Sequence, residues 1–188
     1  MTPQNRIHII NFCRKFTVNS IFFLFPLYLL QIGISGWKIG FVAACYAVAP
    51  LLFSFPVGWI NDHLSIKSVI RLSLLVLTAG FLLIGWTQNY LFLGALFLLV
   101  GVANNALDVS TNSFFYKDRS NVDQNKKYAH VAFWLAFGIA AGTFSGGFLI
   151  HFADFRMMFG VYAFFLLVVQ IVTGSFGPES FTRIPLKE

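Results

Sequence analysis

Apolar residues gather in six runs of roughly twenty residues, separated by short polar segments. A helix rises 1.5 Å per residue, so about 20 apolar residues cross a hydrocarbon core of about 30 Å. Helix is the expected state, because an open sheet edge would leave backbone groups unpaired in lipid. The pattern predicts an all-α integral membrane protein, one domain over residues 1–188, with six transmembrane helices. The runs are Phe16–Ile34, Ile39–Ile60, Val69–Trp86, Leu91–Asn112, Val131–Ile150 and Met157–Phe176.

Composition supports a lipid environment. Of the 188 residues, 57% are hydrophobic and 11% are charged, whereas soluble domains carry about 25% charged residues. The 24 phenylalanines exceed what a soluble domain of this size usually buries. Much of the apolar surface must therefore face a lipid bilayer, the first partner that we expect.

The basic residues are distributed unevenly between the two predicted membrane faces. One face collects 11 of the 13 Lys and Arg residues, and the other holds two. Because cytoplasmic loops are enriched in Lys and Arg, both termini are expected in the cytoplasm, with the chain in the cell (inner) membrane. The net charge of +6 then reflects topology, and no nucleic-acid partner is expected. The larger set is Arg6, Arg14, Lys15, Lys67, Arg71, Lys117, Arg119, Lys126, Lys127, Arg183 and Lys187, and the smaller is Lys38 and Arg156.

The segment after the second predicted helix reads Gly58-Trp-Ile-Asn-Asp62-His-Leu-Ser-Ile-Lys67. It resembles the loop between helices 2 and 3 of the major facilitator superfamily of transporters, G-x-x-x-D-[RK]-x-G-[RK]-[RK]. Gly58, Asp62 and Lys67 stand at its first, fifth and tenth positions. The resemblance implies a cytoplasmic gate motif at these residues. The alternative is that Asp62 and Lys67 are ordinary solvated loop charges.

Glycines recur in the fifth predicted helix at Gly138, Gly142, Gly146 and Gly147. Glycines four apart share one helix face and let a neighbouring backbone approach closely, so helix packing is their expected role. The segment resembles the superfamily pattern G-x-x-x-G-P-x-x-G-G, with Thr143 in place of proline. The full pattern is associated with antiporters, and the missing proline argues against that activity.

The resemblance implies a fold of six helices as two inverted three-helix repeats, which is half of a major facilitator fold. The connection 113–130 would join the two triplets as an amphipathic or irregular cytoplasmic segment. Gly58 precedes Lys67 by nine residues, and Gly147 precedes Arg156 by the same spacing at the equivalent place of the second triplet.

The fourth predicted helix carries polar residues in an otherwise apolar run. Asn104, Asp108 and Asn112 are four residues apart and share a face, with Asn105 beside them. A carboxylate in a membrane helix costs about 2.5–3.5 kcal/mol to insert at the centre, so it should face the bundle interior or water. We expect either a solute or ion pathway along this face, or a structural ion pair between Asp108 and a loop base such as Lys117 or Lys126.

The first predicted helix adds Asn19, Tyr28 and Gln31. In the superfamily, helices 1 and 4 of each half line the central cavity, so the resemblance implies that these residues belong to the same pathway. Single interhelical hydrogen bonds are the alternative role for each. No catalytic, cofactor-binding or metal-binding motif is present in the sequence, and neither Cys13 nor Cys45 has CxxC spacing. We expect no enzyme activity, no cofactor and no metal.

These patterns predict a half-length relative of a secondary transporter for a small solute. A second six-helix unit, or a homo-oligomer, would have to complete the pathway, since the superfamily's site lies between two halves. The alternative is a non-transporting protein, either a truncated remnant or a membrane interaction or assembly module.

The topology leads to a labelling prediction. Cysteines introduced in the loops after Ile60 and Asn112 should react with a membrane-impermeant thiol reagent only from the cytoplasmic side. Cysteines near Ser35 and Asp154 should react only from outside, because the basic residues gather on the opposite face. Reversed accessibility at any of these loops would contradict the six-helix topology.

Overall fold

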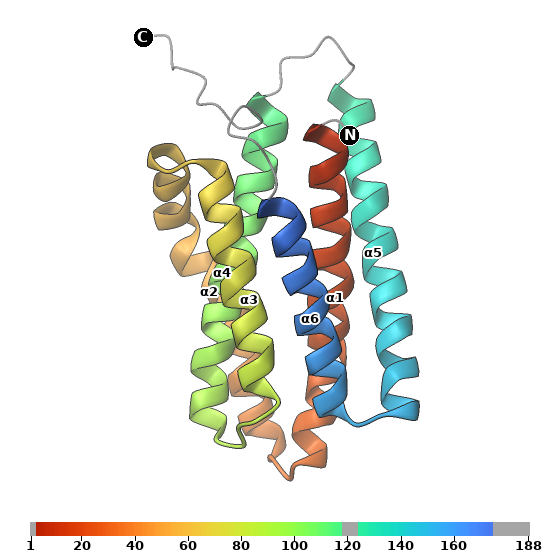
Figure 1. The fold of residues 1–188 in the computed structure, drawn as a ribbon. Helices are drawn as coiled ribbons and strands as arrows, with labels where there is room; N and C mark the ends of the chain where they lie inside the picture. The colour runs from red at the N-terminus through yellow and green to blue at the C-terminus, as the bar shows by residue number, and fades with distance from the viewer. Residues whose placement is uncertain (1–2, 118–123, 175–188) are drawn as a thin grey trace.

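The computed structural model describes the backbone of residues 3–117 and 124–174, and the side chains of residues 8–113 and 128–171. Six α-helices account for most of this backbone, which confirms the all-helical fold expected from the apolar runs (Figure 1). The helices are α1 Pro3–Gln31, α2 Gly36–His63, α3 Ile66–Ile84, α4 Tyr90–Lys117, α5 Gln124–Phe152 and α6 Phe155–Gly174.

Several helices extend beyond the apolar runs. The largest difference is in α1, which begins at Pro3 rather than near Phe16. The predicted helix began after Arg14 and Lys15 because these residues are charged, but both lie inside α1. At the predicted long connection, α4 continues to Lys117 and α5 begins at Gln124. The described part of the connection 113–130, which was expected to be amphipathic or irregular, is therefore helical, and residues 118–123 lie outside the described part of the chain.

Four helical segments are long and apolar enough to cross a membrane: Gly36–His63, Ile66–Ile84, Tyr90–Ser113 and Tyr128–Phe152. In α6 the apolar stretch is shorter, Phe155–Ile171, and α1 is interrupted by polar and charged residues. Large apolar side chains lie on the outside of the bundle, where Phe55 is 86% exposed and Leu51 is 82% exposed. Such a surface is stable against lipid rather than water.

Each half of the chain packs one of its helices mainly against the other half. Helix α2 of the first triplet packs mainly on α4, and α5 of the second triplet packs mainly on α1, while α3 contacts α4 and α6. The start of α1, the end of α4 and the start of α5 lie at one end of the bundle (Figure 1). The core lies among α1, α3, α4 and α6, where the side chains of Leu29, Leu77, Leu107 and Leu166 are fully buried.

Glycines bring α5 directly against the backbone of α1. A Cβ atom on Gly142 would lie 2.0 Å from the carbonyl oxygen of Phe16, and one on Gly138 would lie 2.9 Å from that of Phe12. One turn further, a Cβ on Gly146 would lie 2.0 Å from Ser20 Oγ. The four-residue spacing of these three glycines thus places all three where α5 lies directly against α1. A Cβ on Gly147 would meet nothing within 4 Å among the described atoms.

A second close approach joins α4 to α2. A Cβ on Gly101 would lie 2.8 Å from the carbonyl oxygen of Tyr46 and 2.7 Å from Cβ of Ala49. Pro50 follows one turn after Tyr46 in α2 and has no N–H to donate, so it leaves this carbonyl without its usual helical partner. Gly101 packs at that position, so α2 and α4 also meet in a close backbone contact.

This packing predicts opposite results for two glycines on one helix. Gly142→Ala should destabilise the bundle by about 1–3 kcal/mol, because the new methyl group must push α1 away from α5. Gly147→Ala should leave stability unchanged or raise it by up to about 1 kcal/mol, because alanine favours the helix and has room. The thermal stability of the detergent-solubilised variants measures both. Equal losses in the two variants would contradict this α1–α5 interface.

Candidate functional site

An arginine buried in α1 is the centre of the largest polar network. Arg14 is 1% exposed, and its Nη2 lies 2.5 Å from Oδ1 of Asp108 on α4. Its Nη1 donates to the carbonyl oxygen and to Oδ1 of Asn104, each at 3.1 Å. A guanidinium is always charged and its fork can reach several acceptors, so Arg14 joins α1 to two turns of α4.

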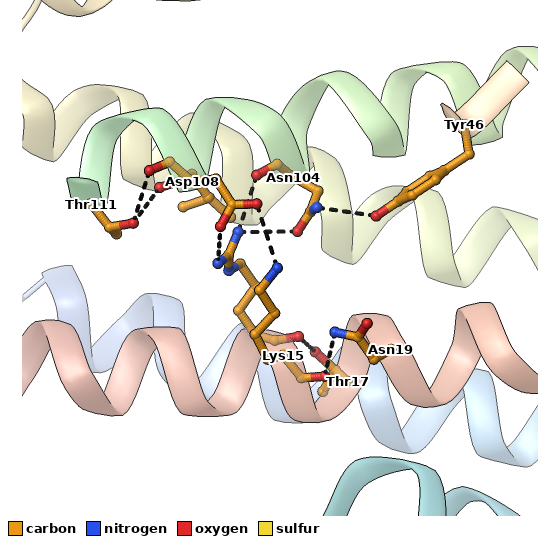
Figure 2. A network of polar contacts seen from close by, with 9 residues as sticks. Lys15, Thr17, Asn19, Tyr46, Asn104, Asp108 and Thr111 are labelled. Atoms are coloured by element: carbon orange, nitrogen blue, oxygen red, sulfur yellow. Dashed lines mark hydrogen bonds and ion pairs between the residues drawn. The ribbon is translucent and has the colours of Figure 1, made fainter. Parts of the chain in front are cut away.

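A second base from α1 reaches the same carboxylate. Lys15 Nζ lies 3.5 Å from Oδ2 of Asp108, a longer contact than the one that Arg14 makes. The Lys15 side chain is 19% exposed and that of Asp108 is 37% exposed. Figure 2 shows Lys15 extending from α1 towards Asp108 and Asn104. Two cations and one carboxylate meet here, so the cluster carries one excess positive charge and is partly open to its surroundings.

Helix α2 contributes a tyrosine to this network. Asn104 Nδ2 donates to Tyr46 Oη at 3.0 Å, so the amide of Asn104 joins Arg14 on one side to Tyr46 on the other (Figure 2). Asn19 lies one turn from Lys15 on α1, where its Nδ2 donates to the Lys15 carbonyl at 3.1 Å. We refer to Arg14, Lys15, Tyr46, Asn104 and Asp108 as the charged network.

Aromatic side chains close one side of the charged network. Phe25 of α1 stacks on Phe97 of α4 with ring centroids 3.9 Å apart. Phe25 follows Arg14 by eleven residues and Phe97 precedes Asp108 by eleven, so the stack lies about 16 Å along the helices from the ion pair, in the direction of the α1–α2 connection. Phe22 packs on the Tyr46 ring with centroids 4.8 Å apart. A layer of aromatic side chains therefore lies between the charged network and the α1–α2 connection.

The structure brings some of the predicted pathway residues together and separates others. Asn104 and Asp108 lie in the charged network, and Asn19 lies beside it. Asn112 is exposed one turn beyond Asp108. Asn105 faces α2 instead, where its Nδ2 donates to Ser54 Oγ at 3.2 Å.

Two predicted pathway residues lie elsewhere on α1. Tyr28 is buried among aromatic rings, and its hydroxyl donates to the Ile84 carbonyl at 3.3 Å, which is the interhelical bond named as its alternative role. Gln31 is exposed at the last residue of α1, about 25 Å from Arg14 by helix rise. Neither residue takes part in the charged network.

The partners of Asp108 differ from the loop bases that the sequence suggested. The carboxylate pairs with Arg14 and Lys15, which lie within α1 and not in the segment before it. The side chains of Lys117 and Lys126 lie outside the described part of the chain. Without Arg14 and Lys15, the basic residues are divided nine against two between the membrane faces. The asymmetry behind the predicted orientation is smaller but keeps its direction.

The predicted gate motif lies at the turn between α2 and α3. Asp62 is exposed, Lys67 is the second residue of α3, and a Cβ on Gly58 would meet nothing within 4 Å among the described atoms. The buried contact of this region comes from Asn61, which accepts a 2.8 Å hydrogen bond from Ser110 Oγ of α4. Of the three motif residues, Asp62 is exposed, whereas Gly58 and Lys67 are half-buried.

Three members of the charged network were not among the predicted site residues: Arg14, Lys15 and Tyr46. A signal for Lys15 was present, because Asn11, Lys15 and Asn19 are four apart and continue a polar stripe into the apolar run. Tyr46 had no such signal, since a single tyrosine in an apolar helix is ordinary. A hydroxyl cluster was also missed, in which Tyr162 Oη lies 2.8 Å from Ser20 Oγ and 2.9 Å from Ser145 Oγ.

The bundle and its charged network indicate a class of membrane protein. Apolar helices with outward-facing aromatic and aliphatic side chains, enclosing buried charges, are typical of integral membrane proteins that move polar solutes. A family model described as Major Facilitator Superfamily matches residues 7–185. The chain therefore belongs to the Major Facilitator Superfamily.

A curated relative supports this assignment. The protein described as "Uncharacterized MFS-type transporter YfkF", from Bacillus subtilis (strain 168), is 28% identical to this chain over 79 residues. The matched segment is 42% of this chain and 20% of the relative's length. The chain thus matches about a fifth of that relative.

The Arg14–Asp108 pair gives a stability prediction. Asp108→Asn should lower stability by about 1–3 kcal/mol, because it leaves the buried guanidinium of Arg14 without its countercharge. Asp108→Asn combined with Arg14→Met should be more stable than the sum of the two single losses predicts, because the unpaired charge is gone. Thermal unfolding of the four proteins in one detergent measures this coupling. Additive losses would mean that the two side chains do not stabilise each other.

Proposed function

We propose that these six helices form one half of a secondary transporter for a small solute, with the charged network on the wall of the pathway. The observation that carries the proposal is a charged cluster between α1 and α4 that is buried at Arg14 yet 37% exposed at Asp108. A cluster that served only to hold two helices together would gain nothing from such exposure. A residue that must meet a solute needs it.

A second six-helix unit would supply the opposite wall. Transporters of this kind place the site between two units that rock against each other. The proposal holds whether that unit is part of the same polypeptide, another copy of this chain or a different protein. Gly58, Asp62 and Lys67 would then form the cytoplasmic gate with that unit.

The helix contacts between the two halves support two inverted three-helix repeats. If α1, α2 and α3 correspond to α4, α5 and α6, then the α2–α4 contact corresponds to the α5–α1 contact, and both are close glycine contacts. The α2–α3 and α5–α6 contacts are both slight, as the correspondence requires. We assign both termini to the cytoplasm, and we propose neither catalysis nor nucleic-acid binding.

A membrane interaction or assembly module is the competing function. The wide exposed apolar faces of α2 and α5 favour it, because only 11% and 17% of their membrane segments are buried within the bundle. Such a module would need those faces and would not need an accessible charged network.

Transport itself provides the test. Membrane vesicles that carry the chain with its native neighbours should take up at least one member of a labelled panel of small organic acids, amines, sugars and amino acids. Asp108→Asn should reduce that uptake at least tenfold, because it changes the charge of the pathway wall. Lys38→Gln is the control, since Lys38 lies over the rings of Trp37 and Tyr90 at the other end of the bundle.

The same vesicles allow a second measurement. In a background with Cys13→Ala and Cys45→Ala, Asn19→Cys should react with a water-soluble thiol reagent because the pathway is hydrated. Phe164→Cys on α6 should remain unreactive although Phe164 is 68% exposed in the bundle, because it faces lipid. If the vesicles take up none of the solutes and Asn19→Cys does not react, the interaction module is favoured.

A further inference from the structure

We infer that the transported solute is a small organic anion and that its acidic group binds between Lys15 and Tyr46, on the open side of the Arg14–Asp108 pair. This inference rests on the proposed function and names the chemical class of its solute.

The charge count is the first argument. The acidic residues of the described part of the chain are Asp62, Asp108 and Asp154. Asp62, in the last turn of α2, and Asp154, between α5 and α6, are both exposed. Asp108 alone of these faces two cations, Arg14 and Lys15. A membrane interior favours neutral clusters, since an unbalanced charge is costly to bury. One more negative charge would balance the charged network.

The contact lengths show which of the two cations is held less closely. Arg14 holds Asp108 at 2.5 Å and also uses two oxygens of Asn104. Lys15 Nζ has a 3.5 Å contact to the other carboxylate oxygen, at the limit of a hydrogen bond. An ammonium group has three donors, so Lys15 retains donors for an incoming anion. Its 19% exposure allows the anion to reach it.

Tyr46 supplies a second donor in the same place. Its hydroxyl oxygen accepts a hydrogen bond from Asn104 Nδ2 at 3.0 Å. A hydroxyl that accepts a bond keeps its own hydrogen to donate. Figure 2 shows Lys15 and Tyr46 on opposite sides of Asn104, with Tyr46 pointing towards that amide. A carboxylate has two oxygens and can accept from both groups.

Donors exceed acceptors throughout the charged network. Nε of Arg14 is fully buried and has no hydrogen-bond partner in the described part of the chain. An arrangement with surplus donors is suited to an acceptor-rich ligand such as a carboxylate or phosphate. A cationic solute is disfavoured, because it would compete with two tethered bases for Asp108 and would meet the like charge of Lys15.

Ligand-induced stabilisation of the purified chain tests the inference. Lactate and phosphate, at fixed chloride concentration and ionic strength, should raise the melting temperature, whereas lactamide and choline should not. Lys15→Gln should raise the half-maximal lactate or phosphate concentration at least tenfold, because it removes a charged donor. Lys15→Arg should largely preserve it. Lys38→Gln also removes one positive charge, but far from the charged network, and should leave it unchanged.

Asp108→Asn provides the opposite change at the same site. It removes the competing carboxylate, so anions should bind at least as tightly as to the unmodified chain, even though uptake is lost. Equal stabilisation by lactate in the unmodified chain and Lys15→Gln would overturn the inference. Stabilisation by phosphate alone would place a phosphate-bearing solute in the site, and stabilisation by lactate alone would place a carboxylate there, and each supports an anionic solute.

The failure of this inference can be told apart from failure of the proposed function. Uptake of a neutral or cationic solute that depends on Asp108 but not on Lys15 would overturn the anion assignment and leave transport intact. Zero-length carbodiimide cross-linking of Lys15 to an acidic side chain of a second six-helix unit would also overturn it, because that side chain would be the missing countercharge. Anion-dependent stabilisation without uptake of any solute would remove the proposed transport and leave the binding site.

Discussion

The structure depends on keeping one guanidinium charged where water is nearly absent. Transfer of an ion from water to a medium of low dielectric costs several kcal/mol even after relaxation, and arginine does not escape this cost by losing its proton. Arg14 is therefore tolerable only with Asp108 and Asn104 beside it. This requirement fixes the level of α1 against α4, and it explains why a carboxylate stands within an apolar helix. The other contacts of the bundle are compatible with that alignment: the Phe25–Phe97 stack on one side and the Asn61–Ser110 bond on the other.

Much of the fold could be predicted from the sequence, because its main determinants are local in the chain. Runs of about twenty apolar residues specify helices, and the four-residue spacing of Gly138, Gly142 and Gly146 specifies a face for close packing. The partner of that face, the backbone of α1 around Phe16, could not be read from spacing. It depends on which helices are neighbours in space, and a glycine pattern carries no information about that. Gly147 illustrates the limit, since it follows the pattern and has no close neighbour among the described atoms.

The site was harder to predict than the fold, for an electrostatic reason. A basic residue at the edge of an apolar run has the same sequence appearance whether it faces cytoplasm or pairs with an acid across the bundle. Arg14 and Lys15 were assigned to the first role because Asp108 lies more than ninety positions away along the chain. The Asn104–Asp108 face was predicted because a carboxylate in an apolar helix has few alternatives. Tyr28 was predicted to line the pathway, but its hydroxyl donates to the Ile84 carbonyl and takes no part in the charged network.

The glycine contacts have a mechanical consequence. At Gly142 and Gly101 the helices touch backbone to backbone, with no flexible side chain between them to absorb movement. A relative movement of the helices would therefore carry α1 with α5 and α2 with α4. The Asn104–Tyr46 bond joins α4 to α2 and would be kept in such a movement, whereas the Arg14–Asp108 pair joins α1 to α4 and would have to lengthen. The energy needed to separate these two charges would then oppose the movement.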